Sequence, residues 1–269
     1  MKTMQKMSIK DIYFHIVLEG MHMSSKKVPF LRIKNIHKNF GHIQALQGVS
    51  MEAYRGEVLA IVGDNGAGKS TLIKILSGVL TPDTGTIQIE NDIYRSLTPR
   101  KAIDAGISTV YQDLALGNTM DVKSNLFLGS EMTRRGFLQK KRMDEEARKL
   151  IGSLEINIPD VTVPVGSLSG GQRQGVAVAR LVHNGGRLLI FDEPTAAMGL
   201  NESSAVLKLI KRLAAEGFAV IVISHNLPQV FHISDRICVM RQGKAVKEFM
   251  TCDTTMDIVV SLITGVTTQ

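Results

Sequence analysis

Short apolar runs alternate with segments of helical period from about Phe30 to the end of the chain. This alternation is typical of an α/β domain built on a mostly parallel sheet. The clearest strands are predicted at residues 57–62, 107–110, 188–191 and 219–224. Each run is poor in charge and is followed by a turn and a helix. We therefore expect strands buried on both faces, with polar chemistry at their carboxyl ends.

The strand pattern stops between residues 113 and 168, and helical pieces at 121–128 and 143–154 replace it. The second piece follows a basic stretch at 134–142. We expect this part of the chain to form an inserted helical subdomain. After residue 201, apolar side chains recur at helical spacing, which predicts a helix packed on the sheet. No internal repeat is visible, so the sequence predicts one module and not two fused copies.

Composition narrows the class of protein. The 269 residues are 21% charged and 44% apolar, which is close to the average of globular proteins. No apolar run reaches the roughly 18 residues of a spanning helix. Two cysteines, Cys238 and Cys252, suggest neither a disulfide framework nor a metal site. The net charge of +7 is ordinary for a lysine-rich surface, and no basic block with interleaved aromatics predicts a nucleic-acid partner.

The amino-terminal residues 1–28 are rich in methionine and carry one short apolar patch, at 12–18. A secretory signal requires a longer apolar stretch and a cleavage site. We expect a disordered extension here, or a start codon assigned upstream of the true one.

A glycine-rich loop follows the first clear strand. The segment GDNGAGKST at 63–71 matches the phosphate-binding pattern G-x-x-x-x-G-K-[ST] and precedes a helix predicted at 72–76. Its glycines allow backbone N–H groups to point inward, Lys69 supplies charge to the outer phosphates, and the Ser70 hydroxyl can ligate Mg²⁺. With glycine at about 7% of residues, a chance match is on the order of one in a hundred. The predicted nucleotide-binding residues are Gly63, Asp64, Asn65, Gly66, Ala67, Gly68, Lys69, Ser70 and Thr71.

Two adjacent carboxylates, Asp192 and Glu193, end the apolar strand in RLLIFDEPT at 187–195. Consecutive strand residues point to opposite faces, so we expect the two to have different roles. Asp192 suits Mg²⁺, directly or through water, and Glu193 suits activation of the attacking water as a general base. Without other motifs, two acidic residues at a strand end more often belong to a solvated turn than to an active site. The phosphate loop in the same chain favours an active site.

A second candidate anion site lies in LSGGQRQ at 168–174. Ser169 is placed to cap a helix that continues through 176–181, and the two glycines open its amino end. Alone, this pattern would usually be only a helix start. A second phosphate-binding helix end makes sense if Ser169, Gly170, Gly171 and Gln172 serve the nucleotide of a partner subunit.

The order of these motifs resembles the ATP-binding-cassette (ABC) ATPases over about residues 31–243. The resemblance implies a single α/β domain at 29–250 with a P-loop NTPase fold. Its parts would be a RecA-like core with a mostly parallel sheet, an antiparallel β subdomain and an inserted α-helical subdomain. The core would span 29–112 and 181–250, the helical subdomain about 113–180, and a C-terminal helix and tail 251–269.

The same resemblance implies roles for three further residues. Phe40 corresponds to the aromatic residue that stacks on adenine, Gln112 to the glutamine that joins Mg²⁺ coordination, and His225 to the histidine that contacts the terminal phosphate. Alone, Phe40 would be read as core and His225 as structural. The implied Mg²⁺ ligands are Ser70, Gln112 and Asp192, and the implied catalytic residues are Glu193, His225, Lys69 and Gln112.

One departure from the wider family follows Thr195, where AAMG at 196–199 replaces Ser-Ala-Leu-Asp. The missing aspartate removes the standard carboxylate bridge across the dimer at this point. The replacement, with the segments at 108–116, 125–129 and 223–243, resembles the monosaccharide-import branch of ribose, xylose and fructose type. That branch often fuses two cassettes in one chain, whereas this chain has one copy.

The resemblance implies an ATPase that powers monosaccharide uptake. Two copies would pair head to tail around ATP and Mg²⁺ at the cytoplasmic face of the cell membrane, bound to separate permease subunits that work with an external sugar-binding protein. Two alternatives remain. An ABC ATPase acting on ribosomes or DNA would be expected to show linked cassettes, a coiled-coil insertion or a basic arm. A cassette that binds ATP without turnover would not need Lys69, Asp192, Glu193 and His225 intact.

Overall fold

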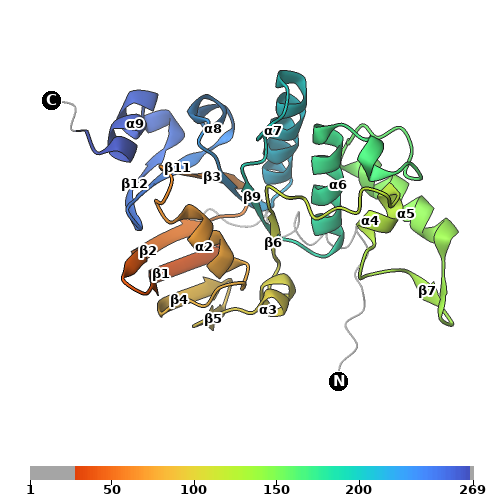
Figure 1. The fold of residues 1–269 in the computed structure, drawn as a ribbon, viewed down its shortest axis with the longest axis horizontal. Helices are drawn as coiled ribbons and strands as arrows, with labels where there is room; N and C mark the ends of the chain where they lie inside the picture. Colours follow the sequence, from red (N-terminus) through yellow and green to blue (C-terminus); the bar gives the residue numbers. More distant parts are fainter. Residues whose placement is uncertain (1–27, 267–269) are drawn as a thin grey trace.

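The structure is a computed structural model that describes residues 28–266 of the chain. The predicted extension at 1–28 lies outside the described residues except for Val28, and so does the end of the predicted tail. The described part is elongated, with β-rich layers at one end and a group of helices at the other (Figure 1). This arrangement confirms the predicted fold class.

An antiparallel sheet forms one layer of the β-rich end. Its strands are β1 (Leu31–Phe40), β2 (Ile43–Ala53), β4 (Thr84–Ile89) and β5 (Asp92–Tyr94), in the order β2-β1-β4-β5. Every neighbouring pair is antiparallel. The sheet places the β1–β2 hairpin beside the glycine-rich loop, where it forms one wall of the candidate site.

The central layer is mostly parallel, as predicted. One set of strands has the order β10-β9-β6 and is parallel throughout, and the other has the order β12-β11-β3, with β12 antiparallel at the edge. Strands β3 and β10 lie alongside each other and join the two sets. The strands are β3 (Glu57–Val62), β6 (Ile107–Val110), β9 (Leu188–Asp192), β10 (Ala219–Ile223), β11 (Arg236–Arg241) and β12 (Lys244–Met250).

Burial explains why these strands could be predicted from the sequence. Every residue of β3 and β10 is buried, so both read as continuous apolar runs and not as alternating ones. The predicted strands at 57–62 and 107–110 coincide with β3 and β6. Strand β9 ends one residue later than predicted and β10 ends one residue earlier.

Helices cover the central layer and end the chain. They are α2 (Lys69–Leu76), α3 (Pro99–Asp104), α7 (Leu200–Ala215), α8 (Leu227–Ile233) and α9 (Met256–Thr264), with a short 3₁₀ turn at Thr251–Asp253. Helix α7 buries Val206, Ile210 and Leu213 against the sheet, which confirms the helix predicted after residue 201. Among the described residues, no helix is long and apolar enough to cross a membrane.

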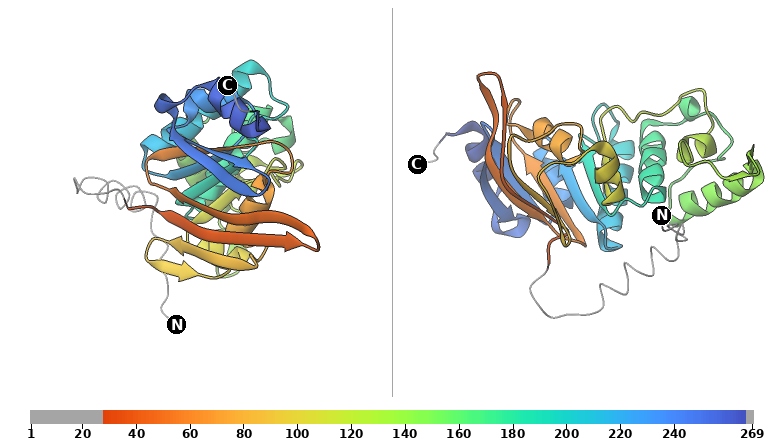
Figure 2. Two further views of the ribbon diagram at one scale, coloured as in Figure 1. Left: turned by 90° about the vertical axis from the view of Figure 1, so that its left-hand side faces the viewer. Right: turned by 90° about the horizontal axis from the view of Figure 1, so that it is seen from below.

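The helical lobe contains α4 (Val122–Leu126), α5 (Lys140–Ser153) and α6 (Gly170–His183), with a 3₁₀ turn at Val165–Ser167. It lies at the opposite end of the molecule from the antiparallel sheet (Figure 2). Helix α6 packs against α4 and α5 within the lobe and against α7 of the core. One apolar cluster includes Phe127 and Leu150 of the lobe together with Phe191 of β9, so the lobe and the sheet share a core.

The lobe also contains a small hairpin that the sequence did not predict. Strands β7 (Thr133–Arg134) and β8 (Phe137–Leu138) pair antiparallel inside the basic stretch. Arg135 and Gly136, at the turn, both have positive φ, as in the tight turns that suit hairpins. The expectation that strands are absent from 113–168 was therefore wrong here. Strands of two residues are too short to produce a visible alternation.

Candidate functional site

The glycine-rich loop connects the buried end of β3 to helix α2. A Cβ atom on Gly63 would lie 2.2 Å from the carbonyl oxygen of Met240, and one on Gly68 would lie 2.6 Å from that of Ala45. Neither position has room for a side chain. The loop is thus packed against the backbone of β11 and of the β1–β2 hairpin, and the first turn of α2 is left with free N–H groups, as a phosphate site requires.

Lys69, the first residue of α2, folds back over the loop. Its Nζ atom donates hydrogen bonds to the carbonyl oxygens of Gly63, at 2.6 Å, and Asp64, at 2.9 Å. Burial lowers the pKa of the Lys69 ammonium, and the charges of Glu193, Asp64 and Asp192 oppose this effect. The structure therefore brings the phosphate loop and the acidic end of β9 within electrostatic range of one another.

The two adjacent carboxylates lie at the carboxyl end of β9, where the sequence predicted polar chemistry. Asp192 is the last residue of the strand, and the N–H group of Glu193 donates to the carbonyl oxygen of Ile223 on the neighbouring strand β10. Oε1 of Glu193 lies 2.8 Å from Nδ1 of His225, which follows β10. Parallel pairing of β9 and β10 thus brings together residues 32 positions apart.

The backbone of Glu193 has a φ of +50°, in the left-handed region that residues other than glycine rarely adopt. Such conformations cost about 1–3 kcal/mol and tend to occur at functional sites, where the surroundings hold them in place. Here the hydrogen bond to Ile223 supplies that support. The turn directs the carboxylate toward His225, whose side chain is 77% exposed and therefore accessible to a substrate.

The carboxyl group of Asp192 is partly removed from water at the end of β9. Burial, and secondarily the neighbouring charge of Glu193, raise the pKa of its carboxyl group, while Lys69 and Lys74 act in the opposite direction. A nearby Mg²⁺ would reverse this penalty, because a cation favours the ionised form. Ser70, at the start of α2, and Gln112, after β6, are exposed and offer the neutral oxygens that Mg²⁺ accepts. The donor types of the predicted ligand set are therefore those that suit Mg²⁺.

Phe40 lies at the end of β1, next to the hairpin turn. Its side chain is 47% exposed, unlike the buried aromatic residues of the core, and Nζ of Lys38 lies 5.7 Å from its ring centroid. The hairpin reaches the phosphate loop, because a Cβ atom on Gly68 would meet Ala45 and Leu46 of β2. An exposed ring on the hairpin that contacts the phosphate loop can stack on a nucleotide base.

The segment predicted as a second anion site is a capped helix end. The Oγ atom of Ser169 accepts a hydrogen bond from the Gln172 N–H at 3.3 Å, and Oε1 of Gln172 accepts one from the Ser169 N–H at 3.0 Å. This reciprocal pair is a capping box and confirms Ser169 as the cap of α6. Glu202 of α7 was missed in the sequence: a Cβ atom on Gly170 would lie 3.3 Å from its Oε2 atom. Only the helix packing reveals that contact.

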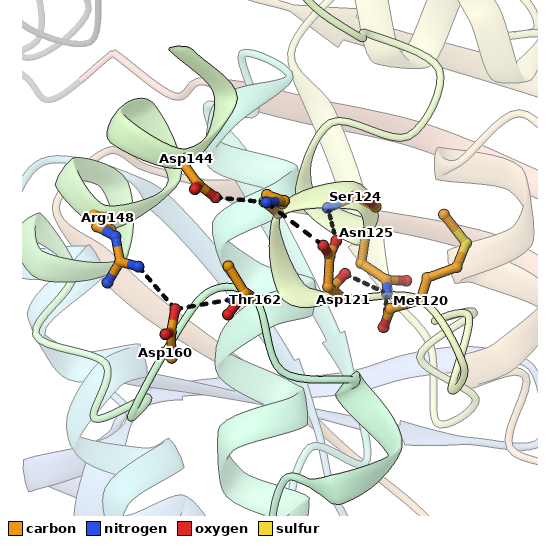
Figure 3. Close-up of polar contacts among 9 residues, drawn as sticks. Met120, Asp121, Ser124, Asn125, Asp144, Arg148, Asp160 and Thr162 are labelled. Carbon is orange, nitrogen blue, oxygen red and sulfur yellow. Dashed lines mark hydrogen bonds and ion pairs between the residues drawn. The ribbon is translucent and has the colours of Figure 1, made fainter. Parts of the chain in front are cut away.

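The loop that carries Gln112 is held from the lobe side. Asn125, on α4, is fully buried. Its amide donates to the carbonyl oxygens of Gly117, Met120 and Asp121 and accepts from the Gly117 N–H at 2.8 Å. Figure 3 shows the Asn125 side chain pointing at Met120 and Asp121. The sequence offered Asn125 only as part of a branch resemblance, and its role as a loop clamp depends on the fold.

The chain departs from the wider family at the start of α7. Gly199 occupies the cap position of this helix and makes no side-chain capping hydrogen bond. Just before it, Ala197 has a φ of +59°. The hydroxyl group of Thr195 donates a hydrogen bond to Oε1 of Gln229 on α8 at 2.6 Å. The segment at 196–199 therefore holds its turn without a carboxylate.

Comparison with known proteins agrees with this geometry. The family model described as ABC transporter matches residues 46–196. The xylose/arabinose import ATP-binding protein XylG of Sulfolobus acidocaldarius is 48% identical over 216 residues, covering 80% of this chain and 86% of the relative. The fructose import ATP-binding protein FrcA of Rhizobium meliloti is 41% identical over 245 residues, covering 88% and 94%. The ribose import ATP-binding protein RbsA of Yersinia pestis is 40% identical over 239 residues, which span 47% of its length.

Solved structures give the same picture. A nucleotide-free ATP-binding cassette from an ABC transporter has a TM-score of 0.77 at 28% identity, covering 87% of this chain and 98% of that one. A dimeric cassette bound to ADP and Pi in a post-hydrolysis state has a TM-score of 0.68 at 25% identity, covering 82% and 98%. The fold and the site thus define an ATP-binding cassette, an ATPase of the P-loop class. The chain belongs to the ABC transporter family.

Proposed function

We propose that the chain is the ATP-hydrolysing subunit of an importer of monosaccharides. The observation that carries the hydrolytic part is the contact between Glu193 and His225 beside the phosphate loop. A carboxylate held this way can accept a proton from water, and an exposed imidazole next to it can contact the phosphoryl group that is transferred. The alternative of a cassette that only binds ATP gives no reason for the strained Glu193 backbone.

The proposed catalytic cycle assigns a role to each candidate residue. The loop at 63–71 binds the phosphates and Phe40 stacks on adenine. Ser70, Gln112 and Asp192 would hold Mg²⁺, which when bound would supply positive charge beside the phosphates. Glu193 orients and deprotonates the attacking water, while Lys69 and His225 stabilise the transferred group. Each role uses a residue type that the chemistry requires.

A second copy of the chain completes the site. The capping box uses the N–H groups of Ser169 and Gln172, so Gly170 and Gly171 are left to offer their N–H groups at this end of α6. We propose that they bind the nucleotide held by a partner. Two copies would associate head to tail around two ATP molecules. The dimeric cassette among the similar structures supports this arrangement. Hydrolysis converts each shared ATP to ADP and phosphate, and release of the products would then allow the dimer to open.

The substrate class rests on the relatives, whose names specify import of xylose or arabinose, fructose and ribose. The absence of a carboxylate at Gly199 agrees with the monosaccharide-import resemblance. We propose that the chain works at the cytoplasmic face of the membrane, bound to permease subunits that receive a sugar from an external binding protein. Growth of the encoding organism on single sugars, with and without the gene, tests this part.

The hydrolytic mechanism is tested with the Glu193→Gln variant, which keeps the shape of the side chain and removes its basicity. We expect phosphate release to fall about 10²–10⁴-fold, the usual contribution of a general base. Light scattering during size-exclusion chromatography should show an ATP-stabilised dimer for the variant only. The control is Glu145→Gln, at an exposed position on α5. A wild-type chain that neither hydrolyses ATP nor dimerises would contradict the proposal.

A further inference from the structure

The guanidinium group of Arg180 lies in an unusual environment for a full positive charge. Arg180 is in the last turn of α6, and its Nη1 and Nη2 atoms donate to the carbonyl oxygens of Ala115, at 2.9 Å, and Leu114, at 3.0 Å. Within residues 28–266, no carboxylate forms an ion pair with it. Burial lowers the pKa of this group. The charge is thus balanced mainly by two backbone carbonyls of one loop.

That loop is shaped to present both carbonyls. Ala115 has a φ of +48°, the left-handed conformation that costs a non-glycine residue about 1 kcal/mol or more. Its N–H group donates to Oδ1 of Asp113 at 3.1 Å, which stabilises the turn. The carbonyl oxygens on the two sides of this turn both accept from Arg180, which gives a two-pronged contact. Gln112 lies two residues before Leu114 in the same segment.

Helix α6 therefore links the proposed site for the partner's nucleotide to the loop that carries Gln112. Its amino end, at Gly170, is the proposed site for the partner's nucleotide, and Arg180 in its last turn grips the loop that carries Gln112. A helix of 14 residues moves as a rigid body, since its backbone hydrogen bonds are internal. Asn125 fixes the far side of the same loop to α4. A shift of α6 when the partner's nucleotide binds would then pull directly on the residues next to Gln112.

We propose that Arg180 is a positioning residue that couples the nucleotide-binding end of α6 to the loop carrying Gln112. Occupation of one composite site thereby sets the geometry of the metal ligand in the chain's own site. The proposal rests on the proposed function, since it requires the partner's ATP to bind at α6. A purely structural arginine would stabilise the lobe but would not make the loop respond to nucleotide.

The test exploits the absence of tryptophan from the chain. In the Glu193→Gln background, Thr119→Trp places a single fluorophore at an exposed position of the loop. Mg-ATP titrations record its emission together with dimer formation by light scattering. We expect emission to change as the dimer forms. With Arg180→Gln added, we expect the emission change to shrink at the same degree of dimer formation. ATP affinity should stay within about twofold, below the roughly fivefold of the weakest typical couplings.

Two further variants separate coupling from folding. Arg180→Lys retains the charge but offers a single ammonium in place of the two-pronged fork, so we expect an intermediate emission change. Arg142→Gln, exposed on α5 of the same lobe, is the matched control and should leave the change intact. The proposal is overturned if Arg180→Gln gives the full emission change, or if the parent dimerises with no change at all. Light scattering that shows no ATP-dependent dimer of the parent refutes the proposed function itself, and the coupling with it.

Discussion

The Nδ1 atom of His225 lies 2.8 Å from Oε1 of Glu193, and the two residues follow adjacent parallel strands of the central layer. The contact exists because β9 and β10 end at the same edge of the sheet, so residues that are distant in sequence become neighbours. The carboxylate is only 21% exposed, whereas the imidazole is largely open. The pair therefore joins a largely buried carboxylate to an accessible imidazole, as the proposed roles require.

If Glu193 and His225 act as a unit, their effects on hydrolysis are not additive. We expect His225→Ala to lower kcat about 10²-fold and Glu193→Gln to lower it further, with the double variant close to Glu193→Gln alone. The measurement is steady-state phosphate release for all four proteins at saturating Mg-ATP. A double variant whose loss equals the product of the two single losses would show that the residues act independently.

The raised pKa of Asp192 predicts a stability that depends on pH. The folded chain holds the Asp192 proton more tightly than the unfolded chain, so ionisation costs folding free energy as the pH rises above the ordinary value of 3.8. Asp192→Asn removes this cost. We therefore expect the variant without nucleotide to melt a few degrees higher at pH 7, where about 1 kcal/mol corresponds to roughly 2–4 °C, and the gain to shrink toward pH 4.

The same variant should lose stabilisation by Mg-ATP, because the carboxylate that would ligate the metal is gone. Thermal melts with and without Mg-ATP measure both effects. Asp92→Asn, at an exposed position of β5, is the control and should change neither melt. A variant that melts lower than wild type without nucleotide would show that Asp192 is stabilising as a charge.

Two glycines of the phosphate loop should differ sharply in their tolerance of alanine. A Cβ atom on Gly63 would lie 2.2 Å from the Met240 carbonyl oxygen, whereas one on Gly66 meets nothing within 4 Å. We expect Gly63→Ala to lower the free energy of unfolding by about 3 kcal/mol through the clash. Gly66→Ala should lower it by only about 1 kcal/mol, because the new side chain is strained by the positive φ but meets no other atom. Urea unfolding compares the two, and equal losses would contradict the packing described here.

Replacing Ala197, in the turn before α7, by glycine should stabilise the folded chain. Ala197 has a φ of +59°, which glycine adopts without the Cβ clash. We expect Ala197→Gly to raise the free energy of unfolding by about 0.5 kcal/mol, the relief being partly offset by the flexibility of glycine in the unfolded chain. Ala205→Gly, at an exposed position within α7, should instead lower it by about 1 kcal/mol. Thermal melts that moved in the same direction for both would refute the strain at Ala197.

The sequence by itself determined the parts of this protein whose chemistry is local. Three features each depend on contiguous residues, so they can be recognised in the sequence alone. They are the loop at 63–71, the carboxylate pair at the end of β9 and the cap at Ser169. The buried strands were equally legible, because two-sided burial produces an uninterrupted apolar run. The short hairpin at 133–138 was not, since two-residue strands leave no period.

The tertiary structure decided which of these pieces meet. Parallel pairing of β9 with β10 creates the Glu193–His225 contact, and the packing of α7 on α6 sets Glu202 beside Gly170. The grip of Arg180 on the loop after Gln112 joins residues 65 and 66 positions apart. Such contacts depend on the relative placement of whole elements. That placement is set by the shared apolar core, which is formed by many side chains from distant segments of the chain. No single segment of the sequence therefore predicts it.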